Sequence, residues 1–153
     1  MKKIASFEVD HTRLLPGMYV SRVDGDITTY DLRFRRPNTE PPMDIDSMHT
    51  IEHLAATWMR NSDRKEDIIY FGPMGCRTGF YFLTRNVEEA DVLSLVKETL
   101  RFIADFEGDI PGVSAIECGN WKEHDLVGAK RYAKEMSEKI AQKTVADMRY
   151  TKG

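Results

Sequence analysis

The chain has 153 residues, enough for one domain with a hydrophobic core, and we expect residues 1–153 to form a single domain. Its 22 basic and 25 acidic residues give a net charge of -3, which excludes a domain-wide positive field for holding nucleic acid. No apolar leader follows Lys2 and Lys3, and no run is apolar enough to span a membrane. We therefore expect a cytoplasmic protein whose partners are neither nucleic acid nor membrane.

The first elements in chain order are two predicted strands, 18–23 and 28–34, joined by a turn. In the second strand apolar and charged residues alternate, which places Arg33 on the face opposite the apolar one. A proline-rich loop follows, and Asp46 or Ser47 is expected to cap a helix that runs to about Asn61.

Two further strands are predicted at 67–72 and 78–85, with Cys76 at the tip of the turn between them. Asn86 resembles the start of a capping box for a helix to about Phe106. A short strand is expected at 113–118, and a lysine-rich helix from His124 to about Tyr150. This order predicts an α+β fold with a mainly antiparallel β-sheet packed with helices.

The helix predicted after the proline-rich loop carries the most informative pattern, "SMHTIEHLAATW". Its apolar residues share one stripe, whereas His49, Glu52 and His53 lie nearly opposite. Histidines at i and i+4 are close enough to share one ion, and H-x-x-E-H is the inverted zincin motif, in which the histidines hold a metal and the glutamate moves protons. The alternative is two unrelated surface histidines, because such a match arises by chance in roughly 1 of 100 chains of this composition.

An open metal site takes a third protein ligand, and the residues alone leave two kinds open. A metallopeptidase of the inverted zincin type would use a distant glutamate, for which Glu117, Glu123 and Glu135 are candidates. The other choice is a thiolate from Cys76 or Cys118.

The two cysteines are far apart in sequence, and without a secretion signal we expect both to be reduced rather than joined. Cys118 ends a predicted strand and precedes a glycine, a rigid place for a ligand. Cys76 lies on a turn beside Arg77, whose charge favours a reactive thiolate. Both remain candidates for chemistry at this point.

Five stretches resemble the S-ribosylhomocysteine lyase (LuxS) family in order and approximate spacing, from Ser6 to Arg131. They are "SFEVDHT", "DLRFRRPN", "MHTIEHL", "GPMGCRTGFY" and "ECGNWKEHDLVGAKR". The resemblance implies an α+β fold and a metal held by His49, His53 and Cys118. That metal would be Fe²⁺, replaceable by Zn²⁺ or Co²⁺, with one ion per subunit.

The resemblance also implies the roles of the remaining site residues. Glu52 and Cys76 would form the acid/base pair. Ser6, His11 and Arg33 would bind substrate, reaching across the interface of a homodimer to the metal of the other subunit. His124, Arg35 and Arg36 also fit the family pattern; for His124 a capping or supporting role is as well founded as a direct one, and for the arginines a solvated or loop-anchoring role is favoured.

One departure from the family concerns the run "IIYFGPMGC". Many members have "I-D-I-S-P-M-G-C" here, so Tyr70 stands in place of an aspartate and Gly72 in place of a serine. The contacts that the family makes there to the amino-acid end of the substrate are therefore not carried over to Tyr70 and Gly72.

The implied reaction explains why these groups are needed. Two metal-assisted isomerisations move the carbonyl of S-ribosylhomocysteine from the first to the third ribose carbon, and β-elimination then releases homocysteine. The other product is 4,5-dihydroxy-2,3-pentanedione, the precursor of autoinducer-2, which connects the reaction to the activated methyl cycle and quorum sensing. The alternatives are an inverted-zincin metallopeptidase and a protein with a purely structural metal site.

Overall fold

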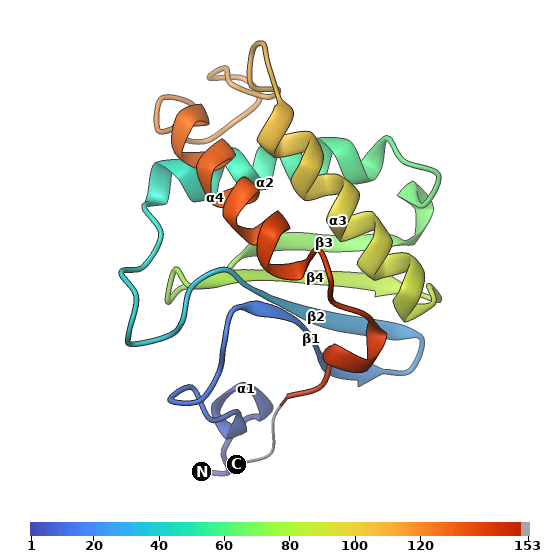
Figure 1. The fold of residues 1–153 in the computed structure, drawn as a ribbon. Helices are drawn as coiled ribbons and strands as arrows, with labels where there is room; N and C mark the ends of the chain where they lie inside the picture. Colours follow the sequence, from blue (N-terminus) through green and yellow to red (C-terminus); the bar gives the residue numbers. More distant parts are fainter. Residues whose placement is uncertain (151–153) are drawn as a thin grey trace.

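The computed structural model of the protein describes residues 1–150. Its four strands are β1 (Gly17–Asp24), β2 (Ile27–Arg33), β3 (Ile68–Pro73) and β4 (Gly79–Arg85). They form one antiparallel sheet in the order β1-β2-β4-β3. The predicted hairpins are therefore confirmed, and β2 and β4 lie side by side at the centre of the sheet (Figure 1).

Three long helices cover one side of this sheet: α2 (Ile45–Arg60), α3 (Glu89–Asp105) and α4 (Leu126–Ile140) (Figure 1). The short helix α1 (Ala5–Glu8) lies beyond the β1 edge at the foot of the view, and two 3₁₀ turns, η1 (Lys65–Asp67) and η2 (Val145–Asp147), complete the described elements. The predicted α+β class is confirmed.

The core lies between the sheet and the helices. Tyr30 of β2 and Phe80 and Phe82 of β4 are fully buried there, and the apolar stripe predicted for α2 packs against the same cluster. Each fully buried aliphatic or aromatic side chain contributes roughly 1.5–3 kcal/mol of burial free energy. This stripe fixes the rotation of α2, so that its histidine-bearing face points away from the core.

Two helix starts differ from the sequence prediction. Asp44, not Asp46 or Ser47, caps α2, because its carboxylate accepts the backbone N–H of Ser47 at 2.9 Å. Asn86 does not cap α3; it adopts a positive φ of 54° in the turn after β4 and leaves the helix to begin at Glu89. An asparagine tolerates that conformation well, and this competed with its capping role.

The predicted strand at 113–118 is wrong. The segment forms turns, in which the backbone N–H groups of Glu117 and Cys118 both donate to the carbonyl of Ser114. Among the described residues it pairs with neither edge strand, β1 nor β3, so it adds no fifth strand to the sheet. Local hydrogen bonds take the place of a ladder.

The last helix is also shorter than predicted, ending at Ile140 rather than near Tyr150. Thr144 and Asp147 form a reciprocal capping box that starts η2 instead. Beyond η2 the carbonyl of Met148 accepts the backbone N–H of Val20 in β1 at 2.8 Å, which carries the chain to the sheet edge. The capping box of η2 and the hydrogen bond between Val20 and Met148 therefore redirect the chain after Ile140, although no glycine or proline follows the helix there.

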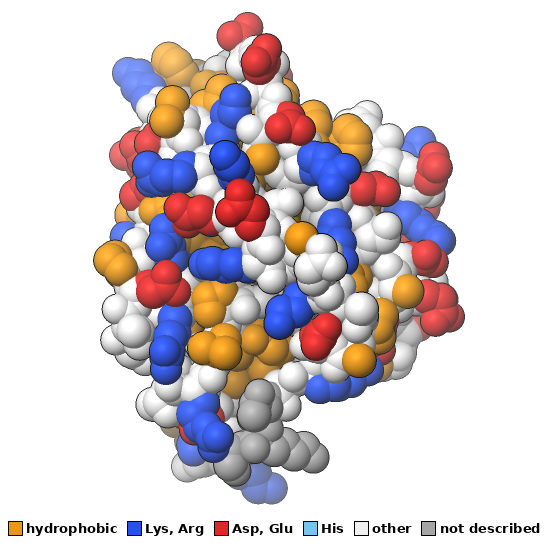
Figure 2. All heavy atoms as spheres, viewed as in Figure 1, with side chains coloured by type: hydrophobic (Ala, Val, Ile, Leu, Met, Phe, Trp, Pro, Cys, Tyr) orange, Lys and Arg blue, Asp and Glu red, His pale blue; other side chains and the backbone are white. Residues whose placement is uncertain are grey.

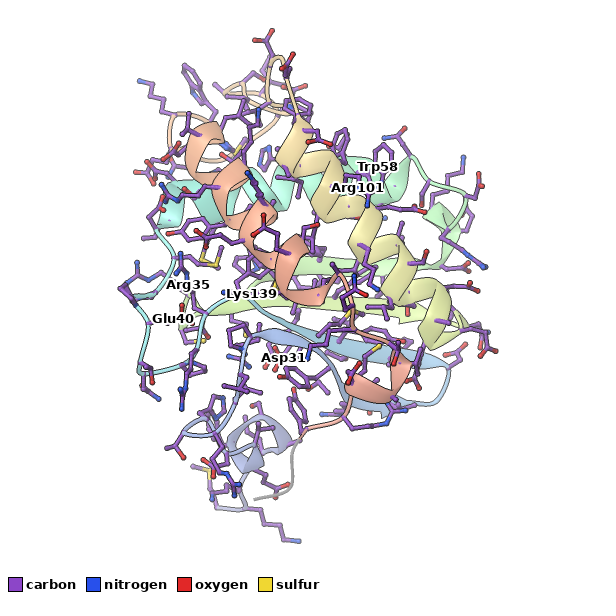
Figure 3. The ribbon with its side chains drawn as sticks, viewed as in Figure 1. Asp31, Arg35, Glu40, Trp58, Arg101 and Lys139 are labelled. Atoms are coloured by element: carbon purple, nitrogen blue, oxygen red, sulfur yellow. The ribbon has the colours of Figure 1, made fainter. Side chains whose placement is uncertain are left out.

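The segment that follows β2 is tied to α4, as Figure 3 shows for Arg35, Glu40 and Lys139. Arg35 pairs with Glu40 at 3.5 Å and with Glu135 at 3.4 Å, and Lys139 donates to the carbonyl of Phe34 at 3.2 Å. The favoured loop-anchoring role of Arg35 is confirmed by these contacts.

Figure 2 shows basic and acidic side chains interspersed over the face formed by α3 and α4. Within residues 1–150, none of the helices has the length and apolar character that crossing a bilayer requires.

Candidate active site

Four side chains converge at one end of the helical layer: His49, His53, Cys118 and His124. Each offers one ligand atom, and these atoms all lie within 4.8 Å of one another. His49 and His53 project from α2, whereas Cys118 and His124 come from the loop 106–125 that arches between α3 and α4 at the top of Figure 1. The histidine pair predicted from the i, i+4 spacing thus lies beside a thiol and a third imidazole.

The histidines on α2 are oriented by backbone carbonyls. Nδ1 of His49 lies 2.9 Å from the carbonyl oxygen of Glu123, and Nδ1 of His53 lies 2.8 Å from that of Pro111. A carbonyl can only accept, so each Nδ1 carries the proton and each Nε2 presents a lone pair. Nε2 of His49 faces Cys118 Sγ at 3.4 Å, and this donor set of imidazoles and a thiol fits a metal ion such as Zn²⁺ or Fe²⁺.

Two glycines allow these contacts. Gly112 has a φ of 74°, which turns the chain beside His53 just after the accepting carbonyl of Pro111. Gly128 lies in the first turn of α4, where an added Cβ would collide with Ser47 Oγ of α2. The absence of side chains at these points brings the loop and α4 close enough to α2 to close the cluster.

His124 is bonded differently from the other two imidazoles. Its Nδ1 lies 3.0 Å from the hydroxyl of Thr50, and its buried Nε2 has no hydrogen-bond partner. Burial lowers the pKa of His124 to about 4, with a further contribution from His49 and His53, so the imidazole is neutral at pH 7.

Glu52 lines a cavity of about 260 Å³ next to the cluster, together with His49, Met74, Gly75 and Arg77. The carboxylate is half-buried, one residue before His53 on α2. It therefore lies where a proton acceptor beside a metal would be placed.

A second, larger cavity of about 530 Å³ contains the other predicted residues, Ser6, His11, Arg33 and Cys76, within one chain. We call it the thiol pocket. Cys76 is exposed on the turn between β3 and β4, as predicted. Ser6 belongs to α1 and His11 to the turn after it, so the N-terminal segment supplies one wall.

Arg33 is the centre of the thiol pocket and is only 2% exposed. It makes a bidentate pair with Asp31 (3.1 and 2.6 Å), donates to the hydroxyl of Thr78 at 2.9 Å, and approaches Cys76 Sγ to 3.9 Å. Burial opposes the charge, but Asp31 outweighs it and raises the pKa of Arg33. A permanent cation therefore faces the thiol.

The two cavities are separated by the same turn. Pro73, Met74 and Gly75 line both, so the turn carrying Cys76 forms a common wall. Arg77, expected to act on the thiol, instead donates to the carbonyl of Met43 at 3.2 Å and lines the cavity of Glu52. The cation whose contact with the sulfur is observed is Arg33.

The glutamates considered as third ligands are engaged elsewhere. Glu117 accepts from Ser114 and Glu123 accepts from Asn120, both at 2.7 Å, while Glu135 pairs with Arg35. Among the described residues the cluster contains none of the three. The ligand set of an inverted-zincin peptidase is therefore not formed.

Asp31, Thr50 and Tyr150 were not singled out from the sequence as parts of the site. Tyr150 donates to Asp31 at 2.7 Å and stacks on Tyr19 with a centroid separation of 5.1 Å. Asp31 alternates with apolar residues in β2 and lies on the same strand face as Arg33, a pattern from which its place in the site could have been predicted. Tyr150 lies more than a hundred positions away from Asp31 in the sequence, so no local pattern indicated their contact.

The unusual pair Tyr70 and Gly72 is explained by packing. A Cβ at position 72 would overlap the ring of Tyr70, so the glycine makes room for the tyrosine. Tyr70 is half-exposed and lines a third cavity with Ser6 and Tyr81.

Comparison with known proteins agrees with this geometry. The sequence model of S-ribosylhomocysteinase (LuxS) matches residues 4–147. The chain is 51% identical to S-ribosylhomocysteine lyase of Clostridium beijerinckii, with 92% of each chain covered. It is 47% identical to the proteins of the same name from Desulfotalea psychrophila (95% of this chain and 98% of the relative) and Phocaeicola vulgatus (98% of each). With the family matched over nearly its whole length and the ligand set assembled, the chain belongs to the S-ribosylhomocysteinase (LuxS) family.

Proposed function

We propose that the protein is a carbon–sulfur lyase that cleaves S-ribosylhomocysteine to homocysteine and 4,5-dihydroxy-2,3-pentanedione. The observation that carries this function is the cluster of His49, His53 and Cys118 beside Glu52, together with a second pocket that holds Cys76. Family membership supplies the substrate. The activity belongs to the activated methyl cycle and to autoinducer-2 synthesis for quorum sensing.

The substrate sets the chemical task. Its thioether is on the fifth ribose carbon, and it can leave only when the fourth carbon loses a proton next to a carbonyl at the third. The carbonyl begins at the first carbon, so protons must be moved twice between neighbouring carbons and oxygens before elimination. The protein therefore needs groups that accept and return protons at several positions.

His49, His53 and Cys118 would hold the metal, one ion per subunit, natively Fe²⁺ with Zn²⁺ or Co²⁺ as substitutes. When bound, the metal supplies Lewis-acid stabilisation of the negative charge that develops on substrate oxygens. The carbonyls of Glu123 and Pro111 keep the two imidazoles in the tautomer that leaves Nε2 available.

Cys76 is the proposed proton carrier for the carbon atoms. Its thiolate is stabilised by the guanidinium of Arg33 at 3.9 Å and by the hydroxyl of Thr78, whose Oγ1 lies 3.2 Å from the sulfur. The thiolate takes a proton from one carbon and returns it to the next, which regenerates the thiolate after each isomerisation.

Glu52 is the proposed partner for the oxygen atoms. It takes protons from hydroxyl groups as the carbonyl moves and, as the acid, returns one to the departing sulfur so that homocysteine leaves as a thiol. In the elimination Glu52 takes the proton of the fourth carbon, the carbon–sulfur bond breaks, a double bond forms between the fourth and fifth carbons, and this proton is the one that the departing sulfur receives. The enol that remains tautomerises to the diketone.

Ser6, His11 and Arg33 are the proposed substrate-binding residues. We propose further that residues 1–153 act as one domain in a homodimer, with the thiol pocket of one subunit facing the metal centre of the other. The common location of these residues in one pocket supports their joint role. The two unpaired cysteines agree with a cytoplasmic location, where thiols stay reduced.

The direct test is incubation of reduced, metal-loaded protein with S-ribosylhomocysteine, with free homocysteine measured by a thiol reagent. We expect stoichiometric release of homocysteine. Protein denatured before addition of substrate controls for spontaneous breakdown. Failure of the metal-loaded protein to release thiol would overturn the function.

A further inference from the structure

The guanidinium of Arg33 divides its donors between two sides of the thiol pocket. Nε and Nη2 donate to the two carboxylate oxygens of Asp31 at 3.1 and 2.6 Å. This pairing leaves Nη1 for Thr78 Oγ1 at 2.9 Å and for Cys76 Sγ at 3.9 Å. The position of Asp31 therefore determines which edge of the guanidinium faces the sulfur.

The hydroxyl of Thr78 links the guanidinium to the sulfur. A guanidinium can only donate, so Oγ1 of Thr78 accepts from Arg33 and keeps its own proton for Cys76 Sγ, which lies 3.2 Å away. The sulfur thus faces two donors, an arrangement that favours its charged form.

Asp31 is held in turn by Tyr150. The carboxylate lies with Arg33 on the sheet face turned away from the helices, where the side chain of Asp31 is only 1% exposed (Figure 3). Its Oδ2 accepts the hydroxyl of Tyr150 at 2.7 Å. Burial and the charge of Asp31 raise the pKa of Tyr150, so the phenol keeps the proton that it donates at neutral pH.

Tyr150 is fixed by a second tyrosine, Tyr19 of β1. Their rings stack with a centroid separation of 5.1 Å, and Tyr19 lies opposite Asp31 in the register of β1 and β2. The hydroxyl of Tyr19 donates elsewhere, to the carbonyl of Leu15 at 2.7 Å. The two stacked phenols therefore have different partners, and the one bonded to Asp31 is that of Tyr150.

We propose that Tyr150 is a positioning residue for Cys76: its hydroxyl holds Asp31, and Asp31 holds Arg33 so that Nη1 faces the sulfur. This inference rests on the proposed role of Cys76 as a proton carrier. Without the phenol, the negative charge of the buried carboxylate is less compensated, draws the guanidinium toward itself and opposes a thiolate nearby. Loss of the phenol should therefore make the thiol a weaker acid.

Other titratable groups also face the sulfur across the thiol pocket. They are His11 of the N-terminal segment, Glu40 of the loop after β2 and Tyr81 of β4. Arg77 is adjacent to Cys76 in sequence but donates to the carbonyl of Met43. A substitution at Tyr150 changes none of these groups, so a change in the acidity of the thiol reports on Asp31 and Arg33.

The test measures the pH dependence of Cys76 alkylation by iodoacetamide in the metal-loaded protein, with the modified peptide followed by mass spectrometry. The rate follows the thiolate fraction, so the midpoint of the profile gives the pKa of the thiol. For Tyr150→Phe we expect the midpoint to rise by about 0.5–1 pH unit. The acid limb of kcat/KM for S-ribosylhomocysteine should move by the same amount. An unchanged midpoint in folded Tyr150→Phe would overturn the proposal.

Tyr19→Phe is the matched control. It removes a hydroxyl from the same stacked pair without removing a donor from Asp31. Its midpoint should equal that of the parent protein even where its Tm is lower. An equal rise in Tyr19→Phe would assign the effect to loosened packing and contradict the proposal.

Asp31→Asn tests the route through the carboxylate. With no negative charge at position 31, adding Tyr150→Phe should move the midpoint no further. A rise as large as in the parent background would show that the phenol acts by another route, which would refute the proposal. Alkylation needs no substrate, so an active lyase with an unmoved midpoint in Tyr150→Phe would refute this inference and leave the proposed function standing.

Discussion

In the candidate metal centre, the cluster of His49, His53, Cys118 and His124, every imidazole is held by a neutral group, either a backbone carbonyl or the hydroxyl of Thr50. In the thiol pocket the sulfur faces a guanidinium that is itself paired with a buried carboxylate. The first region therefore orients the lone pairs of imidazole nitrogens, whereas the second places a positive charge beside a thiol.

The candidate metal centre depends on backbone positions, whereas the thiol pocket depends on contacts between side chains. Neutral anchors fix ring orientation whether or not an ion is present, so the metal centre is prepared by the backbone of α2 and of the loop 106–125. The thiol pocket depends on a chain of side chains that runs from Tyr150 through Asp31 and Arg33 to Cys76. Damage to one region should therefore leave the other intact.

The largest effects are expected from the two cysteines. Cys118→Ala removes a ligand, so the metal affinity should fall by ~10-fold or more and activity should fall with it. Cys76→Ala, the matched substitution in the other region, should keep the metal and lose turnover by ~10² or more. Metal analysis and thiol release on both variants measure this. A Cys76→Ala protein that is purified without metal would contradict the assignment of metal binding to Cys118 and of turnover to Cys76.

Glu52→Gln tests the carboxylate on the metal side. The substitution keeps the size of the side chain but cannot accept a proton, so turnover should fall by ~10² while metal content stays unchanged. Steady-state rates at matched metal loading decide the outcome. A near-normal rate would mean that Glu52 supports the helix and does not transfer protons.

Mixed dimers test whether the two regions that meet belong to different subunits. Arg33→Ala and Glu52→Gln, unfolded together, mixed equally and refolded, should regain about a quarter of the parent activity, since half of the dimers are mixed and half of their sites are whole. Arg33→Ala mixed with Cys76→Ala is the control. Both changes fall in one thiol pocket, where the side chains approach to 3.9 Å, so no activity should return.

A quarter of the activity from the control mixture would instead place Cys76 with the metal of its own subunit and Arg33 across the interface. If neither mixture recovers while mixed dimers are shown to form, each subunit completes its own site. The two mixtures together therefore locate the boundary between subunits.

The smallest effect is expected from Tyr150→Phe, which keeps the ring on Tyr19 but removes the hydrogen bond to Asp31. Loss of one bond to a charged group should lower the free energy of unfolding by roughly 1.5–3 kcal/mol, with metal content unchanged. Guanidinium unfolding at neutral pH measures the loss.

The same variant changes the pH dependence. Burial, and then the charge of Asp31, raise the pKa of Tyr150 above its ordinary value. The contribution of Tyr150 to stability is therefore complete below the unfolded pKa of about 10 and is lost as the pH rises beyond it. The parent protein should lose more stability than Tyr150→Phe between pH 9 and about 11, and parallel curves would refute this assignment.

The sequence was sufficient wherever a periodic pattern coincided with burial. The stripe on α2, the hairpin strands and the turn of Cys76 were all predicted from local residues, and so was the donor pair His49 and His53. These features depend on neighbours within a few positions. Their geometry is determined by helical or strand periodicity.

Features that depend on distant contacts were predicted incorrectly or not at all. The segment 113–118 has the composition of a strand, but no strand edge is paired with it and turns prevail. The helix predicted to reach Tyr150 ends at Ile140, because a capping box and the Val20–Met148 hydrogen bond direct the chain to β1. The partners Thr50 and Tyr150 carry no local signal, since each is defined by a residue that lies far along the chain.

The loop 106–125 has one more consequence, for the entropy of the chain. It is about twenty residues long without a helix or strand, yet it supplies Cys118 and His124, and loops of that length without structure of their own are uncommon in compact domains. An ion bound by Cys118 and by the two histidines of α2 would close the loop as a cross-link does, so part of the binding energy would appear as order in the loop. Removal of metal by a chelator should then raise protease cleavage and amide exchange between residues 106 and 125 while the sheet remains protected.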